Sequence, residues 1–567
     1  MTKKNAILFS AIFAVLYSIA YAVIGPMIKS QDIRFQSSFI VPCIICFVIC
    51  LIVNFLVFYF VPRIRFGKLN DKLTKRIDKV KNYKLFLILW AIIFVCWIPA
   101  YLILYPGVLS YDILSQTLSA MGTITSNHHP VLHTFTIRVF MNLGESVFGG
   151  YEYGIGLLSL MQMLLLSYSL TRMVMLIKSK KVPILIVILV AILSACWFMN
   201  AVLSMTMIKD VLHAAFLVLF ACHYTEIVMN PKEYVKKKRN LILFPIVVFF
   251  MCAYRNNGFH IFLFCLGILA LIRIPKIKKI KTYIPLIIVT ILAGVAFKIY
   301  SGPVFKALNI EQGEVREALS IPIQQLQRVA VLHGGELTEE QNDKMLYYIT
   351  DLSWRDWDPG RKYHPFISDP AKSCFSSAAY NEDPAAFWKY YLEIGNQFTK
   401  EYIIAALSNT AGFWYPGYYE FSYVEFHNYP SEQFVVPLER KSIVDSGVLN
   451  KGYESLCLGE FWRKTPGIRF FFVSGFVSWI LLYALVLSWK KKGFFTKVFP
   501  LFLPLIGQFG IMLLSPMSSF RYSWPFYLLL PVTLIGIFVK ENKAEEAKEE
   551  NTETEVTGQE ALIQEGE

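Results

Sequence analysis

Residues 5–26 read NAILFSAIFAVLYSIAYAVIGP, an uninterrupted apolar run near the start of the chain. A helix crosses a hydrocarbon core of about 30 Å with roughly 20 apolar residues, because each residue rises about 1.5 Å. Lysines precede the run, and no small-residue cleavage site follows it, so we interpret it as a membrane span and not as a cleaved signal peptide. This stretch predicts a membrane protein.

The composition of the whole chain points the same way. Apolar residues make up 55% of the 567 residues and charged residues only 17%, against about a quarter charged in soluble globular proteins. The net charge of +14 would suggest nucleic-acid binding if the basic residues shared one soluble face, but they form short clusters between apolar runs. We therefore predict no nucleic-acid partner and assign these clusters to orientation in the membrane.

Similar apolar runs recur along the chain, which predicts an all-α polytopic protein with about 12 transmembrane helices. They begin near residues 6, 38, 85, 151, 183, 208, 241, 258, 284, 468, 498 and 524. The predicted organisation is a membrane region of about nine spans (1–300), a mostly helical extracytoplasmic domain (301–467), about three further spans (468–539) and a disordered acidic tail (540–567).

The distribution of lysine and arginine predicts the orientation of these spans. The short segments on one side hold 28 of these residues, and the short segments on the other side hold 6. Because cytoplasmic loops carry the excess of positive charge, we expect both termini to be cytoplasmic and the loop 105–150 and the segment 301–467 to lie outside. The lysine-rich loops suit a bacterial cytoplasmic membrane.

Residues 301–467 carry helical signals of their own. Thr338 and Gln341 fit a capping box, and Asp383 followed by Pro384 is typical of a helix start. Cys374 and Cys457 are the only cysteines in a long polar segment, and the sequence leaves open whether they form a disulfide.

Functional residues of such a protein are expected at span ends, because a charge inside hydrocarbon costs about 2.5–3.5 kcal/mol. Seven ionisable residues near span ends lie on the predicted outer side, and they are Asp112, His128, His129, Lys209, Asp210, Arg255 and Arg521.

Asp112 lies in YPGVLSYDILSQ (105–116), where Pro106 and Gly107 end the preceding span and turn the chain. A carboxylate held at the membrane surface can act as a general base that accepts the proton of an attacking hydroxyl. The alternative is that Asp112 only caps the short helix that follows it.

Two further pairs allow more than one interpretation each. His128 and His129 are a substrate-binding pair or ligands of a divalent metal, or else plain interfacial histidines. Lys209 and Asp210 form a local ion pair at a helix end, or else provide a phosphate contact and a second acid.

The arginines are candidates for phosphate binding. Arg255 lies in YRNNG (254–258) between two apolar runs, and Arg521 lies in SSFRY (518–522) before the last span. A guanidinium binds phosphate bidentately, although an arginine at a span end also serves as a snorkelling anchor. In the 301–467 segment, the aromatic patch FWYPGYYEF (413–421) fits sugar stacking or an interfacial belt, and Gln324, Gln325 and Arg328 are candidate polar contacts.

These motifs together resemble the GT-C superfamily of polytopic membrane glycosyltransferases, and more closely a bacterial branch with largely unassigned substrates. The features shared with it are the Tyr-Pro-Gly segment leading to Asp112, the His-Pro before the next span, Arg-Asn-Asn-Gly and the late Arg-Tyr. The resemblance spans residues 85–539.

The resemblance implies an enzyme that transfers a sugar from a polyprenyl-phosphate donor to a glycan, lipid or protein acceptor by a single inverting displacement. It makes Asp112 the catalytic base, and it assigns the donor phosphate to Arg255 and Arg521, with Lys209 as a further contact. Some members carry a divalent metal, and the chain departs from the family in having two extra spans before Asp112 and no clear second acidic motif beyond Lys209-Asp210. The metal therefore stays open.

Two alternatives belong to other classes. A lipid-linked-sugar flippase or transporter fits the span count, but such a protein places its ionisable residues near the membrane midplane. A cell-surface polysaccharide polymerase or ligase also has a large outer segment with arginines.

Overall fold

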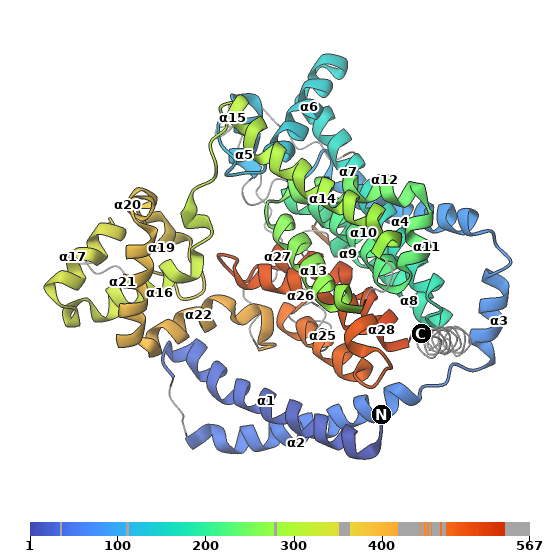
Figure 1. The fold of residues 1–567 in the computed structure, drawn as a ribbon, viewed down its shortest axis with the longest axis horizontal. Helices are drawn as coiled ribbons and strands as arrows, with labels where there is room; N and C mark the ends of the chain where they lie inside the picture. Colours follow the sequence, from blue (N-terminus) through green and yellow to red (C-terminus); the bar gives the residue numbers. More distant parts are fainter. Residues whose placement is uncertain are drawn as a thin grey trace, which may run out of the picture.

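The computed structural model describes residues 1–33, 37–108, 113–276, 280–350, 363–417 and 472–538, together with isolated positions between 443 and 467. Within these residues the elements are all helices, which confirms the all-α prediction (Figure 1). The predicted tail, Asp112 and Cys457 lie outside the described residues. Cys374, the other cysteine of the proposed pair, is buried.

Among the described residues, seven helical segments are long and apolar enough to cross a membrane, so the chain is a multi-pass membrane protein. Two further helices, α8 (Ile184–Cys196) and α9 (Phe198–Ser204), meet at 45° and add an eighth if they form one broken span. The seven are α1 (Lys3–Ser30), Ser37–Arg63 with α2 (Ile40–Phe60), α4 (Asn82–Leu104), α7 (Tyr151–Ser179), α10 (Lys209–Met229), Lys281–Ala307 with α14 (Ile284–Ile299), and Phe494–Leu513 with α26 (Leu503–Leu513).

The other four predicted spans coincide with shorter or interrupted helices. α12 (Lys238–Tyr254) and α13 (Asn257–Arg273) have 17 residues each, and α25 (Ser474–Ser488) has 15. The last predicted span is divided into α27 (Phe520–Leu529) and α28 (Pro531–Phe538), since proline cannot continue the hydrogen-bond ladder. The structure thus places a helix at each predicted span, and the count of twelve crossings stays a prediction.

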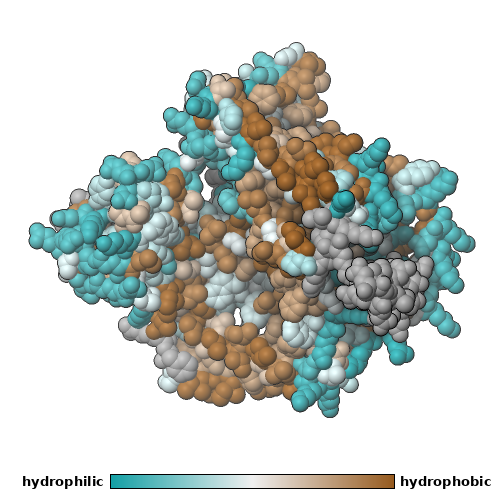
Figure 2. All heavy atoms as spheres, viewed as in Figure 1, coloured by the Kyte–Doolittle hydropathy of each residue, from teal (hydrophilic) through white to brown (hydrophobic). Residues whose placement is uncertain are grey.

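The membrane region is built around α10. Most of this helix is buried, and it packs against α7, α12 and α27, as expected for a helix that is apolar on all sides. α1 and α2 pack on each other at the edge of the molecule (Figure 1), and only Asn54 and Phe58 of α2 are buried. Figure 2 shows that the surface of the membrane helices is largely hydrophobic.

A second body of helices stands at one end of the membrane region (Figure 1). Its core contains Ile323, Leu326, Phe387 and Ile394, and its surface is hydrophilic (Figure 2). We call it the helical domain. It comprises α16 (Ser320–His333), α17 (Glu339–Tyr348), α19 (Asp369–Ser373), α20 (Ser377–Glu382) and α21 (Pro384–Gln397).

The local signals in this domain are confirmed. Thr338 and Gln341 form the capping box at the start of α17. Asp383 caps α21 by accepting a hydrogen bond of 3.0 Å from the amide of Ala386. These caps satisfy amides that the helix itself leaves unpaired.

The short helices mark the two ends of the membrane region. α3 (Lys68–Ile77) and α11 (Pro231–Lys236), both basic, lie at the end opposite the helical domain (Figure 1). α5 (Ile113–Met121), α6 (Val131–Phe148) and α15 (Phe305–Ala307) lie together at another edge (Figure 1). In this view the basic helices and the helical domain lie at opposite ends (Figure 1), and the orientation of the spans in the membrane stays a prediction.

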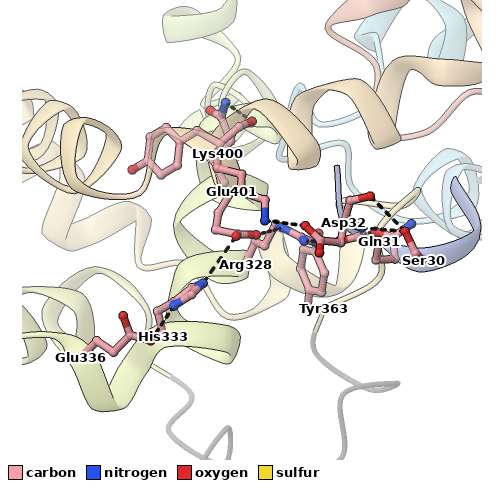
Figure 3. Close-up of polar contacts among 11 residues, drawn as sticks. Ser30, Gln31, Asp32, Arg328, His333, Glu336, Tyr363, Lys400 and Glu401 are labelled. Atoms are coloured by element: carbon pink, nitrogen blue, oxygen red, sulfur yellow. Dashed lines mark hydrogen bonds and ion pairs between the residues drawn. The ribbon is translucent and has the colours of Figure 1, made fainter. Parts of the chain in front are cut away.

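A buried polar network joins the helical domain to the end of α1 (Figure 3). Arg328 on α16 forms an ion pair of 2.7 Å with Glu401 of α22 (Thr399–Trp414), and its Nη2 donates to the carbonyl of Gln31 at 2.6 Å. Tyr363 accepts a further hydrogen bond of 3.1 Å from Arg328, and Lys400 pairs with Asp32 at 2.5 Å. Arg328 is therefore a structural residue that ties three segments together.

The other candidate contacts in this region are also internal. Gln324 donates to the carbonyl of His364 at 2.6 Å, and Gln325 donates to the carbonyl of Tyr402 at 2.9 Å. In the aromatic patch, Phe413 and Tyr415 are buried, and Tyr415 packs with α1. Neither ring is exposed to lipid or available to a sugar face, whereas residues 418–421 lie outside the described residues.

Candidate functional site

The predicted site residues meet where several helices begin. α6, α10, α13 and α27 each start within two residues of at least one of them. The members of this cluster are His129, Lys209, Asp210, Arg255 and Arg521, to which the structure adds His133 and Tyr522. Because the amides of a first helical turn are unpaired and carry partial positive charge, such ends favour anions.

Asp210 is the buried carboxylate of this cluster. It lies in the first turn of α10 and forms an ion pair with Arg255, which stands in the loop between α12 and α13. The cationic groups of Arg521 and Lys209 are among its other charged neighbours. Asp210 thus takes part in more than a local ion pair with Lys209, because its carboxylate binds a guanidinium 45 residues away along the chain.

Tyr522 brings the two arginines together. The guanidinium carbon of Arg521 is 4.6 Å from the centre of the Tyr522 ring, and that of Arg255 is 5.3 Å from the same centre. Arg521 also donates to the hydroxyl of Tyr522 at 2.6 Å. Both arginines are buried, so they are not snorkelling anchors, and the aromatic ring holds them by cation–π contacts.

A second chain of contacts starts at Lys209. Its ammonium is 3.4 Å from Nδ1 of His129, and Nε2 of His129 is 2.9 Å from the hydroxyl of Ser115 on α5. An ammonium can only donate, so Nδ1 accepts and Nε2–H is the donor toward Ser115. His129 is thereby fixed between α10 and α5, whereas the adjacent His128 is exposed.

His133 is a site residue that the sequence analysis missed. It is fully buried one turn after His129, and its ring lies 6.2 Å from that of Tyr254. Neither ring nitrogen has a hydrogen-bond partner among the described residues. Burial, together with the nearby charge of Lys209, lowers the pKa of His133 to about 3. The sequence does contain a signal for this residue: His133 follows His129 by four residues at the start of a helix, which places the two side chains on the same face.

This pKa gives the stability of the protein a pH dependence. The folded-state pKa of about 3 lies below the ordinary 6.5, so the unfolded chain binds the proton more readily, and the stabilisation is present above pH 6.5 and lost as the pH falls toward 3. By pH 5 we expect a loss of about 2 kcal/mol from this residue.

Thermal unfolding in detergent at pH 7.5 and pH 5 measures this loss. From pH 7.5 to pH 5, the midpoint temperature of unfolding should fall less in His133→Phe than in the wild type. The control His128→Phe changes an exposed neighbour, and its midpoint temperature should fall as much as that of the wild type. An equal fall in wild type and His133→Phe would contradict the assignment.

Asp112 lies outside the described residues, but the structure describes the chain before and after it. Before it, the amide of Val108 donates to the carbonyl of Met205 at 2.9 Å. After it, Ile113 starts α5 and packs with Met207. Both neighbours therefore contact the segment that leads into Lys209.

The metal prediction has no support in this cluster. Among the described residues, no group of three or more histidine, cysteine and acidic side chains is arranged to hold a metal ion. The rings of His128 and His129 are inclined by 71° with centres 4.7 Å apart, and their burial differs. Chemically, the described site gathers two guanidinium groups and an ammonium, which suits an anionic ligand.

A protein-family model described as a family of unknown function (DUF6020) matches residues 118–552. The match includes the described cluster and starts after Asp112. No curated protein matches the chain, and no solved structure does.

Proposed function

Since the chain belongs to DUF6020, a family of unknown function, we propose its activity from its own side chains: a membrane glycosyltransferase that uses a polyprenyl-phosphate sugar donor. The acceptor is an extracytoplasmic glycan, lipid or protein. The site faces the outside of a bacterial cytoplasmic membrane, on the side of the helical domain, with both termini in the cytoplasm.

The observation that carries the proposal is the gathering of Lys209, Arg255 and Arg521 at converging helix starts. Lys209 and Arg521 are among the charged neighbours of Asp210, and the helix starts around them favour anions. Guanidinium groups match the geometry of a phosphate. The site thus fits a ligand whose phosphate is presented from the membrane.

The reaction requires one base and one stabilised leaving group. The acceptor hydroxyl oxygen attacks the anomeric carbon, its proton passes to Asp112, and the bond from the anomeric carbon to the phosphate oxygen breaks. The electron pair leaves with the lipid phosphate, where the arginines stabilise the growing negative charge. The configuration at the anomeric carbon is inverted because there is one displacement.

Asp210 is less suited to act as the base than Asp112. Its carboxylate is buried and already paired with Arg255, and Arg521 and Lys209 add positive charge around it. Surrounding cations stabilise a carboxylate in its charged form and make it a weaker base. In this mechanism Asp210 positions Arg255, and the proton goes to Asp112.

The test is sugar transfer from a synthetic polyprenyl-phosphate donor by the purified protein in proteoliposomes. Arg521→Gln should lower kcat/KM about 10- to 150-fold, because a hydrogen bond to a charged group contributes about 1.5–3 kcal/mol. The control is Arg316→Gln, a half-exposed arginine paired with Glu314 in another part of the chain, and it should not change the rate.

Absence of transfer with every lipid-phosphate donor, combined with movement of the intact sugar-lipid across the bilayer, would overturn the proposal in favour of a flippase. Chain elongation without a lipid-phosphate monosaccharide donor would favour a polymerase.

A further inference from the structure

An apolar groove lies between α13 and α14, on the surface of the membrane region. Its volume is about 480 Å³, within the range of small-molecule sites. The lining side chains are apolar except for Lys298. They are Phe259, Ile291, Gly294, Val295, Lys298, Ile299 and Pro303.

The groove has the length of one leaflet. On the α14 side it runs from Ile291 to Pro303, which spans about 18 Å at 1.5 Å per residue, or roughly half of the hydrocarbon thickness. These residues form the second half of the candidate span Lys281–Ala307. Ile291, Val295 and Ile299 are each about half exposed, and Figure 2 shows hydrophobic surface over α14. The groove therefore opens to lipid tails.

The floor of the groove is open because Gly294 has no side chain. A Cβ atom there would be 3.6 Å from the ring of Phe262, which is ordinary van der Waals contact. The backbone thus tolerates a larger residue at this position, and the side chain of that residue would fill the groove.

Lys298 gives the groove its charge preference. Its ammonium lies 4.8 Å from the centre of the Phe259 ring, and no acid among the described residues pairs with it. A cation at the membrane surface gains about 1 kcal/mol from an anionic lipid. The groove has no other charged or hydrogen-bonding side chain with which to recognise a sugar, so it distinguishes ligands by one negative charge and an apolar chain.

The groove adjoins the cationic site. Phe259 follows Arg255 by four residues and stacks on Phe297 with ring centres 5.0 Å apart. Tyr300, next to Ile299, belongs to the same apolar cluster as Val131, which starts the helix that carries His133. An occupant of the groove therefore lies against α13, which starts two residues after Arg255.

We propose that this groove binds an anionic phospholipid of the surrounding leaflet, with one acyl chain along Gly294 and the phosphodiester on Lys298. This goes beyond the proposed function, because the lipid is a bound component of the membrane and not the sugar donor. Its test measures lipid binding and requires no sugar transfer, so failure of either proposal is distinguishable from failure of the other.

The experiment is native mass spectrometry of the full chain in detergent, titrated with phosphatidylglycerol, phosphatidylcholine or a polyprenyl phosphate. We expect the wild type to bind phosphatidylglycerol more tightly than phosphatidylcholine. Lys298→Met should weaken phosphatidylglycerol binding about fivefold, and Gly294→Leu should remove the site by filling it.

The controls match each change. Lys306→Met removes an exposed lysine of α15, and Gly267→Leu adds the same side chain to α13 where a Cβ meets open space. Both should bind as the wild type does. Unchanged binding in Lys298→Met and Gly294→Leu would overturn the proposal, and so would equal affinity for the two phospholipids or preferential binding of the polyprenyl phosphate in this groove.

Discussion

Asp112→Asn is expected to lower the rate of sugar transfer by about 10²- to 10⁴-fold, the usual contribution of a general base. Asparagine has nearly the same size and can still cap a helix, but it cannot accept the proton of the attacking hydroxyl. The substitution therefore separates catalysis by Asp112 from the structural alternative, in which it only caps α5.

The measurement is kcat with a saturating polyprenyl-phosphate donor, accompanied by the unfolding temperature of each variant. Asp343→Asn is the matched control, because it is the same change at an exposed position of the helical domain, and it should leave kcat unaltered. Undiminished turnover in Asp112→Asn at an unchanged unfolding temperature would remove this residue from the mechanism and favour the cap, because asparagine caps a helix as well as aspartate does.

Asp210→Ala is expected to destabilise the protein by about 3–5 kcal/mol, the usual cost of removing one partner of a buried ion pair. Asp210 is fully buried and Arg255 nearly so, and the substitution leaves the Arg255 charge without its carboxylate. The double variant Asp210→Ala, Arg255→Met should recover much of the loss, because it removes both charges.

Chemical denaturation in detergent compares these variants. The control is Asp78→Ala, which breaks the 2.7 Å pair with Lys178 at a carboxylate whose side chain is 57% exposed, and exposed pairs contribute only about 0–1 kcal/mol. If Asp210→Ala lowered the free energy of unfolding no more than Asp78→Ala does, the ion pair between Asp210 and Arg255 would not stabilise the site.

Much of the fold follows from patterns in the sequence. The apolar runs locate helices because a lipid-exposed backbone must satisfy its own hydrogen bonds. The number of crossings is harder to predict, since breaks depend on single residues. Pro531 divides the last run into α27 and α28, although its surroundings are as apolar as those of an unbroken span.

The site could be predicted in part. The cost of charge in hydrocarbon and the predicted orientation made Lys209, Arg255 and Arg521 candidates at outer span ends, and the structure brings these three together. The sequence could not predict that Asp210 pairs with Arg255, because the two residues come close only when the helices pack together. Tyr522 was part of the quoted SSFRY motif, but its role depends on the ring lying against two guanidinium groups.

Burial is a further property that composition does not report. The aromatic patch contains Phe413 and Tyr415, which fit a membrane belt by residue type, yet both pack inside the protein. Gln324, Gln325 and Arg328 have the side chains of a binding site and instead join segments of the chain to one another.

The Arg328 network sets a requirement on biosynthesis. The carbonyl of Gln31 at the end of α1 receives its hydrogen bond from an arginine 297 residues further along the chain. At about 5–20 residues per second, the ribosome needs roughly 15 to 60 s to make the intervening segment. During that interval the first hairpin of the protein has no partner from the helical domain, so a membrane chaperone or the translocon has time to act on it before the structure closes.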